Sequence, residues 1–232
     1  MALLYTHLIP ATFGGKARMN VANALAAAAA AWAAGAHIHD IRQGLRTFTT
    51  SFFQAPGRLN LVEVGGIRVV IDYCHNVDGM RNLADFVRRM MADGPAKTGR
   101  TGRAIGVIGM PGDRRDEDMK EYGALAATAF DEIIVREDRN LRGRQPGVTA
   151  ELVAEGVRSA KADSGARTAK VDKVLSELTA VRAALRRANR GDLLVMCVDD
   201  AVAVYKEAMA MAGQTEGTTA FADPGEVDAP EG

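Results

Sequence analysis

The sequence predicts an α/β fold built on one mostly parallel sheet, with helices on both faces and one antiparallel edge hairpin. Across residues 57–211, short apolar runs alternate with segments of helical length, which is the pattern of parallel strands joined by helical crossovers. The run Val69–Ile71 is β-branched and unbroken, as in strands that are buried on both faces. Gly65–Gly66 separates two apolar runs and predicts a tight hairpin, which adds the antiparallel strand.

The individual elements follow from local composition. Residues 20–34, NVANALAAAAAAWAA, predict a helix because alanine has the highest helix propensity, and Gly35 ends it. Residues 38–47 predict a second helix with Asp40 in its first turn, where the helix dipole favours an acid. After a hairpin over 62–71, we expect helices at 79–92, 117–129, 148–160, 173–188 and 200–211, and strands at 104–108, 131–135, 168–171 and 192–198. The resulting architecture is Rossmann-like.

Composition and charge exclude several classes of protein. Residues 212–232 hold five acids and no base and have little to bury, so we expect a disordered acidic tail. The remainder carries 29 bases and 24 acids, a net charge of +5, which suits an anionic small molecule better than a nucleic acid. Cys74 and Cys197 match no metal or disulfide spacing, which favours a cytoplasmic protein. The apolar run 24–34 is too short to span a bilayer, so no membrane partner is expected.

Polar residues follow directly where the buried strand around Val70 ends. Asp72, His75 and Asn76 lie within five positions of one another, at the carboxyl end of the strand, where open α/β sheets bind their ligands. The stretch alone leaves an equal alternative open. Asp72 or Asn76 could instead cap the helix that starts near Gly79.

Two further loops follow predicted strands. The loop within Gly106–Gly123 contains glycines beside Arg114 and Arg115, and such a loop can bring backbone N–H groups and positive charge to a phosphate or carboxylate. The alternative is a solvated turn that leads into an acidic first helical turn. The loop VREDRNLRGRQPG, residues 135–147, is charged throughout, and a run of charges is most often a solvated face.

Three motifs together carry a family resemblance. NVANALAAAAA, APGRLNLVEVGGIRVVIDYCHNVDGM and GMPGDRRDED resemble, in order and spacing, the carboxy-terminal part of the Mur ligase superfamily. The resemblance covers about residues 5–208. Within the superfamily, GDRRDED is most similar to the Mur-like half of the cyanophycin synthetases.

The resemblance implies an ATP-dependent amide ligase. In such enzymes a carboxylate attacks the γ-phosphate of ATP, and an amine displaces the phosphate from the resulting acyl phosphate. The cyanophycin synthetases build an aspartate backbone with arginine branches, and their Mur-like half adds the arginine. The implied cofactors are ATP and Mg²⁺, and the implied substrates are an aspartyl peptide and arginine. Phosphoryl transfer depends mainly on positioning and charge stabilisation.

The resemblance also implies roles for single residues at a nucleotide site. By the family's pattern, Asn23 contacts adenine, Arg58 contacts the phosphates as the catalytic residue, and Asp72 contacts the ribose hydroxyls. His75 and Asn76 lie beside the nucleotide. Taken alone, each has a plain structural alternative, such as a satisfied helix amide for Asn23 or a surface charge beside a turn for Arg58.

The two charged loops are implied to bind the other substrates. In related ligases the loop after the strand 131–135 helps to recognise the incoming amino acid. Glu137 and Asp138 are therefore candidates for an arginine guanidinium, whose fork matches a carboxylate. Arg114 and Arg115 are candidates for an anionic substrate group.

The sequence departs from the family in one major respect. A Mur ligase needs a phosphate-binding loop that ends in Gly-Lys-Ser/Thr, whereas Gly15–Lys16 is followed by neither Ser nor Thr. Residues 1–56 look like the last strand and two helices of the central ATPase domain, and residues 57–211 like the carboxy-terminal domain. We therefore expect a fragment or a truncated relative that acts as a homo-oligomer or with a partner chain carrying the phosphate loop. The magnesium ligands are expected mainly in that missing domain, and no metal ligand is predicted here.

Two other functions stay open at this point. The missing phosphate loop favours a catalytically inactive nucleotide-binding or regulatory module of the same fold. An unrelated Rossmann-type oxidoreductase is disfavoured because no G-x-G-x-x-G motif follows the first strand.

Overall fold

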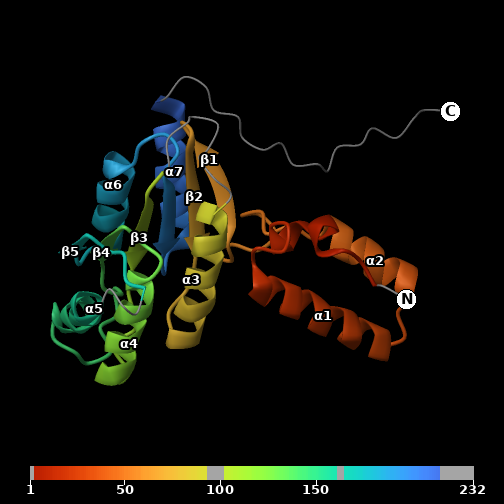
Figure 1. Cartoon of the computed structure of the whole chain (residues 1–232), viewed down its shortest axis with the longest axis horizontal. Coiled ribbons are helices and arrows are strands. Elements are labelled where there is room, and N and C mark those ends of the chain that lie inside the picture. Colours follow the sequence, from red (N-terminus) through yellow and green to blue (C-terminus); the bar gives the residue numbers. More distant parts are fainter. Residues whose placement is uncertain (1–2, 93–101, 161–164, 215–232) are drawn as a thin grey trace.

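The computed structural model describes residues 3–92, 102–160 and 165–214. Within these ranges, six strands form one sheet in the order β1-β2-β6-β3-β4-β5 (Figure 1). Strands β1 and β2 are antiparallel, and every other neighbouring pair is parallel. The strands are β1 Asn60–Val64, β2 Ile67–Asp72, β3 Ala104–Ile108, β4 Glu132–Val135, β5 Lys170–Lys173 and β6 Leu193–Cys197.

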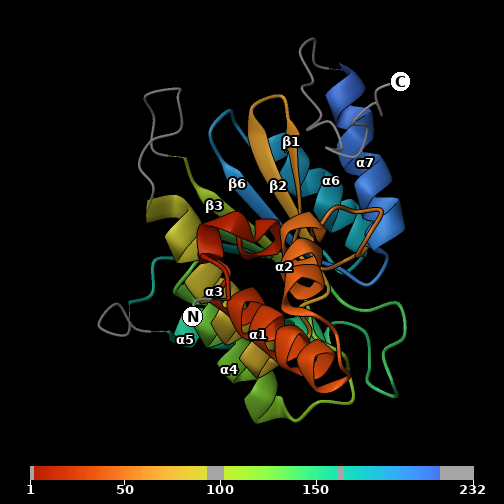
Figure 2. The same ribbon diagram turned by 90° about the vertical axis from the view of Figure 1, so that its right-hand side faces the viewer.

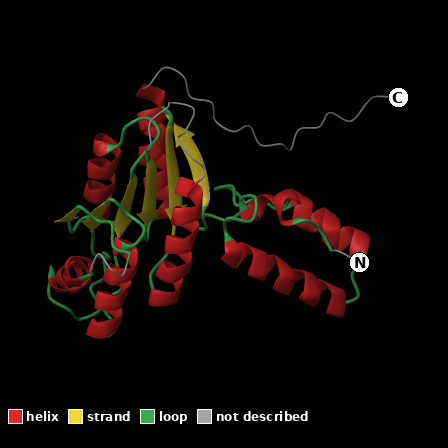
Figure 3. Cartoon of the chain, viewed as in Figure 1, coloured by secondary structure: helices red, strands yellow, loops and turns green. Residues whose placement is uncertain are grey.

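Helices cover both faces of the sheet (Figure 3). The helices that follow the hairpin are α3 Val77–Ala92, α4 Asp116–Ala127, α5 Val148–Ser159, α6 Glu177–Arg187 and α7 Ala201–Gln214. Helices α3, α4 and α5 pack with alternate strand residues such as Val70 and Val195 into one core. Helices α6 and α7 pack on the opposite face with residues such as Val69 and Leu194. This alternation along each strand is what a sheet buried on both faces requires.

The predicted α/β fold with a mostly parallel sheet and one antiparallel edge pair is confirmed. The largest differences lie around β5, which occupies 170–173 rather than 168–171, so that α6 starts at Glu177 rather than at residue 173. The KVDK segment has no apolar run, and its position depends on pairing with β4, where Lys173 lies opposite Val135. Local sequence carries no information about that register.

The last helix also extends further than expected. Helix α7 ends at Gln214, so residues 212–214, which we expected to begin the tail, are helical. The rest of that expected tail lies outside the described residues. Over the described ranges, no helix is both long enough and apolar enough to cross a bilayer.

An N-terminal lobe projects from the sheet domain (Figure 1) and lies in front of it when that side faces the viewer (Figure 2). It consists of the 3₁₀ turns η1 Thr6–Leu8 and η2 Pro10–Thr12 and the helices α1 Arg18–Ala33 and α2 Ile38–Thr47. Helix α1 buries only Ala28 among its own residues. It therefore forms because of its alanine propensity rather than because of packing.

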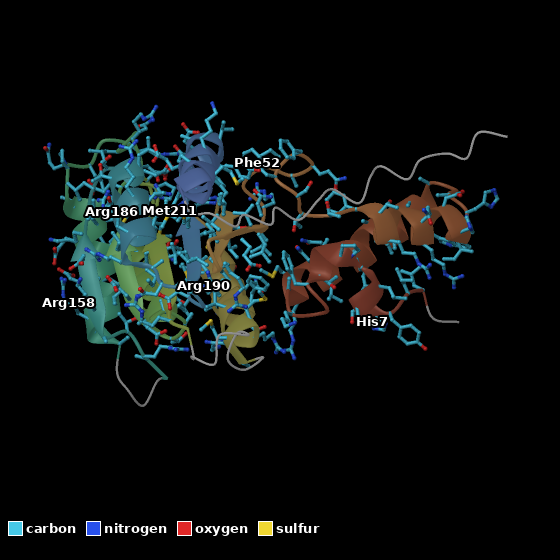
Figure 4. All side chains as sticks on the ribbon, turned by 90° about the horizontal axis from the view of Figure 1, so that it is seen from above. His7, Phe52, Arg158, Arg186, Arg190 and Met211 are labelled. Carbon is cyan, nitrogen blue, oxygen red and sulfur yellow. The ribbon has the colours of Figure 1, made fainter. Side chains whose placement is uncertain are left out.

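Aromatic contacts join the lobe and its connecting segment to the sheet domain. The ring of Phe13, just before α1, meets Phe86 of α3 edge to face, with ring centroids 5.2 Å apart. Phe52, which lies in the connection between α2 and β1 and is labelled in Figure 4, stacks on Tyr205 of α7 with ring centroids 4.1 Å apart. The neighbouring Phe53 is 83% exposed. The lobe is thus attached at its base, where Ala17 joins the core of the sheet domain with Phe13 and Met19 packed beside it, while most of α1 buries little.

The low burial of α1 predicts uneven protection against amide hydrogen exchange. Because α1 buries so little, its amides should exchange faster than those of β6, and equal protection would contradict this. Replacing Phe13 by alanine removes the ring contact with Phe86, which is worth about 0.5–1.5 kcal/mol beyond the lost burial, so exchange in α1 should become up to roughly tenfold faster. Exchange in β6 should not change. Val202→Ala is the control, since it removes an exposed apolar side chain from α7 and should leave α1 exchange unaltered.

Candidate functional site

A cavity of about 790 Å³ lies between the N-terminal lobe and the carboxyl end of β2. Its apolar wall is formed largely by alanines of α1, together with Ile41 and Leu45 of α2 and Leu83 of α3. The polar residues that line it are Asn20, Asn23, Asp40, Thr50, Arg58, Asp72 and Asn82. An apolar chamber with a few convergent polar groups is the usual form of a small-molecule site.

Asp72 ends β2 and faces this cavity. Its Oδ2 accepts a hydrogen bond from the Leu59 backbone N–H at 2.9 Å, and its Oδ1 accepts one from the Cys74 N–H at 2.8 Å. Burial raises the pKa of Asp72 above its ordinary value of 3.8, although these two hydrogen bonds and the nearby Arg58 act to lower it. Each carboxylate oxygen has a second lone pair. Asp72 can therefore accept hydroxyl hydrogen bonds while it holds the backbone in place.

The turn that carries Arg58 is organised by Asn60, which is fully buried. Asn60 Oδ1 accepts from the Gly57 N–H at 2.6 Å, and its Nδ2 donates to the carbonyls of Thr50 and Ala55, both at 2.8 Å. These contacts hold the chain through two left-handed residues, Gly57 at φ +70° and Leu59 at φ +49°. The sequence interpretation missed Asn60. The available signal was a polar residue at the start of β1, directly before the apolar Leu61 and Val62.

Arg58 itself is exposed and lines the cavity. Its guanidinium carbon lies 5.6 Å from the centroid of the Tyr73 ring, within the range of a cation–π contact. The Tyr73 ring in turn lies 4.6 Å from the His75 ring. Arg58 is thereby held near the cavity mouth while its N–H groups stay available.

His75 and Asn76 lie outside the large cavity. His75 Nδ1 is 3.0 Å from the Tyr73 carbonyl oxygen. Asn76 Oδ1 accepts from the Gly79 N–H at 2.7 Å and so caps the first turn of α3. The capping alternative considered for this stretch therefore applies to Asn76, whereas Asp72 faces the cavity.

Asn76 and Arg114 come together at a second, smaller cavity of about 220 Å³. Arg115, by contrast, points its guanidinium at Asp118, with two N···O distances of 2.6 and 3.0 Å. The hydrogen bond to Asp118 raises the pKa of Arg115. The loop glycine Gly112 is packed closely, since a Cβ there would lie only 2.1 Å from the Leu141 carbonyl oxygen. The absence of a side chain at Gly112 therefore allows close contact with the loop that contains Leu141.

That neighbouring loop crosses over the residues before α4. Arg144 donates to the carbonyls of Gly112 and Arg114, both at 2.6 Å, and Arg142 pairs with Asp113 at 2.8 Å. The two loops that the sequence singled out therefore form one hydrogen-bonded unit. Their charged residues largely bind each other.

Glu137 and Asp138 are both engaged within the chain. The Glu137 carboxylate accepts from the backbone N–H groups of Gly147 and Ala150 and from the Thr149 hydroxyl, and so caps α5. Asp138 forms an ion pair with Arg136, whose side chain is only 2% exposed. The sequence interpretation also missed Arg136, because it is one of many charged residues in the stretch 135–147.

Arg136 joins three parts of the sheet's carboxyl edge. Its Nε and Nη2 donate to the Cys197 carbonyl at 3.1 and 3.0 Å, and its Nε lies 3.4 Å from Glu177 Oε2. Burial acts to lower the pKa of Arg136, but the carboxylates of Asp138 and Glu177 outweigh it and the pKa is raised. A buried cation between two carboxylates locks this edge in one arrangement.

The described residues include no group of three or more His, Cys, Asp or Glu side chains placed to hold a metal ion. The polar side chains that line the large cavity include instead the amides of Asn20 and Asn23, the carboxylate of Asp72 and the guanidinium of Arg58. Amide and carboxylate groups suit a heterocycle and hydroxyls, and the guanidinium suits a phosphate.

The sheet and the cavity define a Rossmann-like α/β domain with a candidate ligand site at the carboxyl end of a strand. The model of the family described as "Mur ligase, glutamate ligase domain" matches residues 57–197. The chain belongs to the Mur ligase family.

Curated relatives agree with this membership. The chain is 43% identical over 189 residues to cyanophycin synthetase of Synechocystis sp., a match that covers 82% of this chain and 20% of that protein. It is 41% identical over 190 residues to cyanophycin synthetase of Crocosphaera subtropica, covering 81% and 20%. The chain thus spans about one fifth of these relatives.

Solved structures share the fold. The chain is similar to FolC of E. coli in complex with DHPP and ADP, with a TM-score of 0.57 and 21% identity, over 83% of this chain and 39% of FolC. It is also similar to a murein peptide ligase from Psychrobacter arcticus, with a TM-score of 0.56 and 18% identity, over 84% and 37%. At this identity the likeness extends to the fold.

The buried amide of Asn60 predicts a large effect on stability. Asn60→Ala removes three hydrogen bonds and leaves the Gly57 N–H and two carbonyls without a protein partner, so the free energy of unfolding in urea should fall by about 3 kcal/mol. Asn140→Ala is the control, because Asn140 is exposed and accepts one local hydrogen bond. Its cost should stay below about 1 kcal/mol. Similar losses for both variants would show that Asn60 does not organise the turn.

Proposed function

We propose that the chain is the carboxy-terminal portion of an ATP-dependent amide ligase and that the large cavity holds the nucleoside of ATP. One observation carries the proposal. Asn23, Arg58 and Asp72 come from α1, the turn before β1 and the end of β2, and all three line the same cavity. These are the residues that the Mur ligase pattern assigns to adenine, phosphate and ribose.

The chemistry of each group suits its proposed partner. The amide of Asn23 matches the donor and acceptor edge of adenine. The Asp72 carboxylate accepts hydrogen bonds from the ribose hydroxyls, and the exposed guanidinium of Arg58 binds phosphate oxygens. ATP supplies the γ-phosphoryl group that activates a carboxylate as an acyl phosphate. Arg58 would stabilise the charge that develops during this transfer.

The proposed substrates are arginine and an aspartyl peptide, which rests on the similarity to the cyanophycin synthetases. Arg114 lines the smaller cavity beside Asn76 and is the candidate for an anionic substrate group. Glu137 and Asp138 already bind α5 and Arg136, so their proposed part in arginine recognition is to hold the loop 135–147 in shape. Arg115 is likewise bound to Asp118 within the chain, so its proposed part is also to hold its loop in shape.

The phosphate loop and the magnesium ligands are proposed to come from a Mur ligase central domain, in the same protein or in a partner chain or second copy. The α1–α2 lobe would form part of that domain. A catalytically inactive nucleotide-binding or regulatory module is the second candidate, because the 232 residues contain no Gly-Lys-Ser/Thr loop. The two candidates share the nucleoside site and differ in catalysis.

The ribose contact predicts a specific coupling between protein and ligand. With the wild-type chain, 2′,3′-dideoxy-ATP should bind about tenfold more weakly than ATP in calorimetry, because two hydroxyl bonds to a carboxylate are lost. In Asp72→Ala both nucleotides should bind equally weakly, which is the non-additivity of interacting groups. If the variant still discriminates between the two nucleotides, Asp72 is a structural residue.

The phosphate contact is tested by comparing ligands with and without phosphates. Arg58→Ala should weaken ATP binding by about tenfold and leave adenosine binding unchanged, since a guanidinium bonds mainly to the phosphate oxygens. Arg88→Ala removes the same charge from an exposed position on α3 and should change neither. Equal weakening of ATP and adenosine by Arg58→Ala would contradict the assignment.

Catalysis separates the two candidate functions. The 232-residue chain alone should release no ADP from ATP in the presence of an aspartyl peptide and arginine, because its sequence has no Gly-Lys-Ser/Thr loop to hold the β- and γ-phosphates and Mg²⁺. Addition of the central domain of a cyanophycin synthetase should restore ADP release that depends on both substrates. Release by the chain alone would overturn the expectation, and no release with the added domain would favour the inactive module.

A further inference from the structure

Two asparagines lie one helical turn apart on α1, and both line the large cavity. Asn20 Nδ2 donates to the carbonyl oxygen of Ala11 in η2 at 2.7 Å. A carbonyl oxygen can only accept, so this contact determines the orientation of the Asn20 amide. Nδ2 must face Ala11, and Oδ1 must face away from it.

The orientation of Asn20 in turn determines that of Asn23. Asn23 Nδ2 donates to Asn20 Oδ1 at 3.3 Å. The reversed amide would place its oxygen against the Asn20 oxygen, with no proton between them. Asn23 therefore keeps Oδ1 as a free acceptor and one remaining N–H as a donor. The Ala11 carbonyl therefore determines the orientation of both asparagine amides.

We propose that Asn20 is a positioning residue that makes the cavity selective for adenine over guanine by orienting the amide of Asn23. The inference rests on the proposed nucleoside site. Adenine presents an amino donor at N6 beside an acceptor at N7, which an asparagine amide matches with one acceptor and one donor. Guanine presents two acceptors, O6 and N7. Its O6 would face the Asn23 oxygen, and both would lose their hydrogen bonds to water.

A purely structural role for Asn20 makes a different prediction. If Asn20 only ties α1 to η2 through Ala11, every substitution that removes its Nδ2 should have the same effect. Asn20→Asp removes the donor to Ala11 but keeps an oxygen that can accept from Asn23. Asn20→Leu is of similar size and removes both functions. The two variants share the structural loss and differ only in the contact that orients Asn23.

The experiment measures the affinities of the whole chain for ATP and GTP by calorimetry, together with the melting temperature of each variant. The wild-type chain should prefer ATP by about tenfold or more, as expected for one matched amide–base pair. Asn20→Asp should melt at a lower temperature and keep this preference. Asn20→Leu should melt at a similarly lowered temperature, and its ATP-to-GTP preference should fall to about threefold or less because the Asn23 amide can then rotate.

Each contrary result has a distinct meaning. If Asn20→Leu keeps the wild-type ATP-to-GTP ratio, or if Asn20→Asp loses it equally, the positioning role is overturned. If the wild-type chain binds ATP and GTP equally, the selectivity is overturned while the nucleotide site stands. If it binds neither nucleotide, the proposed function fails together with the inference.

Discussion

The carboxylate of Asp72 is the interaction on which the rest of the candidate site depends. It stands at the tip of a buried strand and accepts one backbone N–H from each side, from Leu59 before the hairpin and from Cys74 after it. The first contact holds the turn that presents Arg58, and the second directs the chain toward α3. A single side chain thus fixes the turn that carries Arg58 relative to the carboxylate of Asp72. Its raised pKa reflects the desolvation that this position imposes on the carboxylate.

Most of the fold was predictable because its signals are local. The alanine run of α1, the Gly65–Gly66 turn and the β-branched run of β2 each specify their element without reference to distant residues. The position of β5 was not predictable in the same way, since KVDK has little intrinsic preference and takes its place from pairing with β4. The register of a strand depends on tertiary contacts, and it cannot be inferred from a segment that has no apolar pattern.

The site was predictable in part, and the reason differs from residue to residue. Asn23, Arg58 and Asp72 were found through motif resemblance, and the structure brings them to one cavity. Asn60 and Arg136 were missed because their partners, such as the Thr50 and Cys197 carbonyls, are backbone atoms that no side-chain motif reveals. Glu137 looked like a free carboxylate in a charged run, whereas three donors at the start of α5 occupy it. Sequence shows which charges are present, but the fold decides which of them are already neutralised.

The cavity walls come from both the N-terminal lobe and the sheet domain, which meet at the base of the lobe, where Ala17 enters the shared core and Phe13 contacts Phe86. A molecule that touches both Asn23 and Asp72 would therefore act as a bridge between the lobe and the sheet domain. By thermodynamic reciprocity, such a ligand stabilises the closed arrangement of the lobes by the same free energy by which closure tightens the ligand. The affinity for such a ligand would then depend on the fraction of molecules in which the lobe and the sheet domain are in the binding arrangement, as well as on the groups that line the cavity.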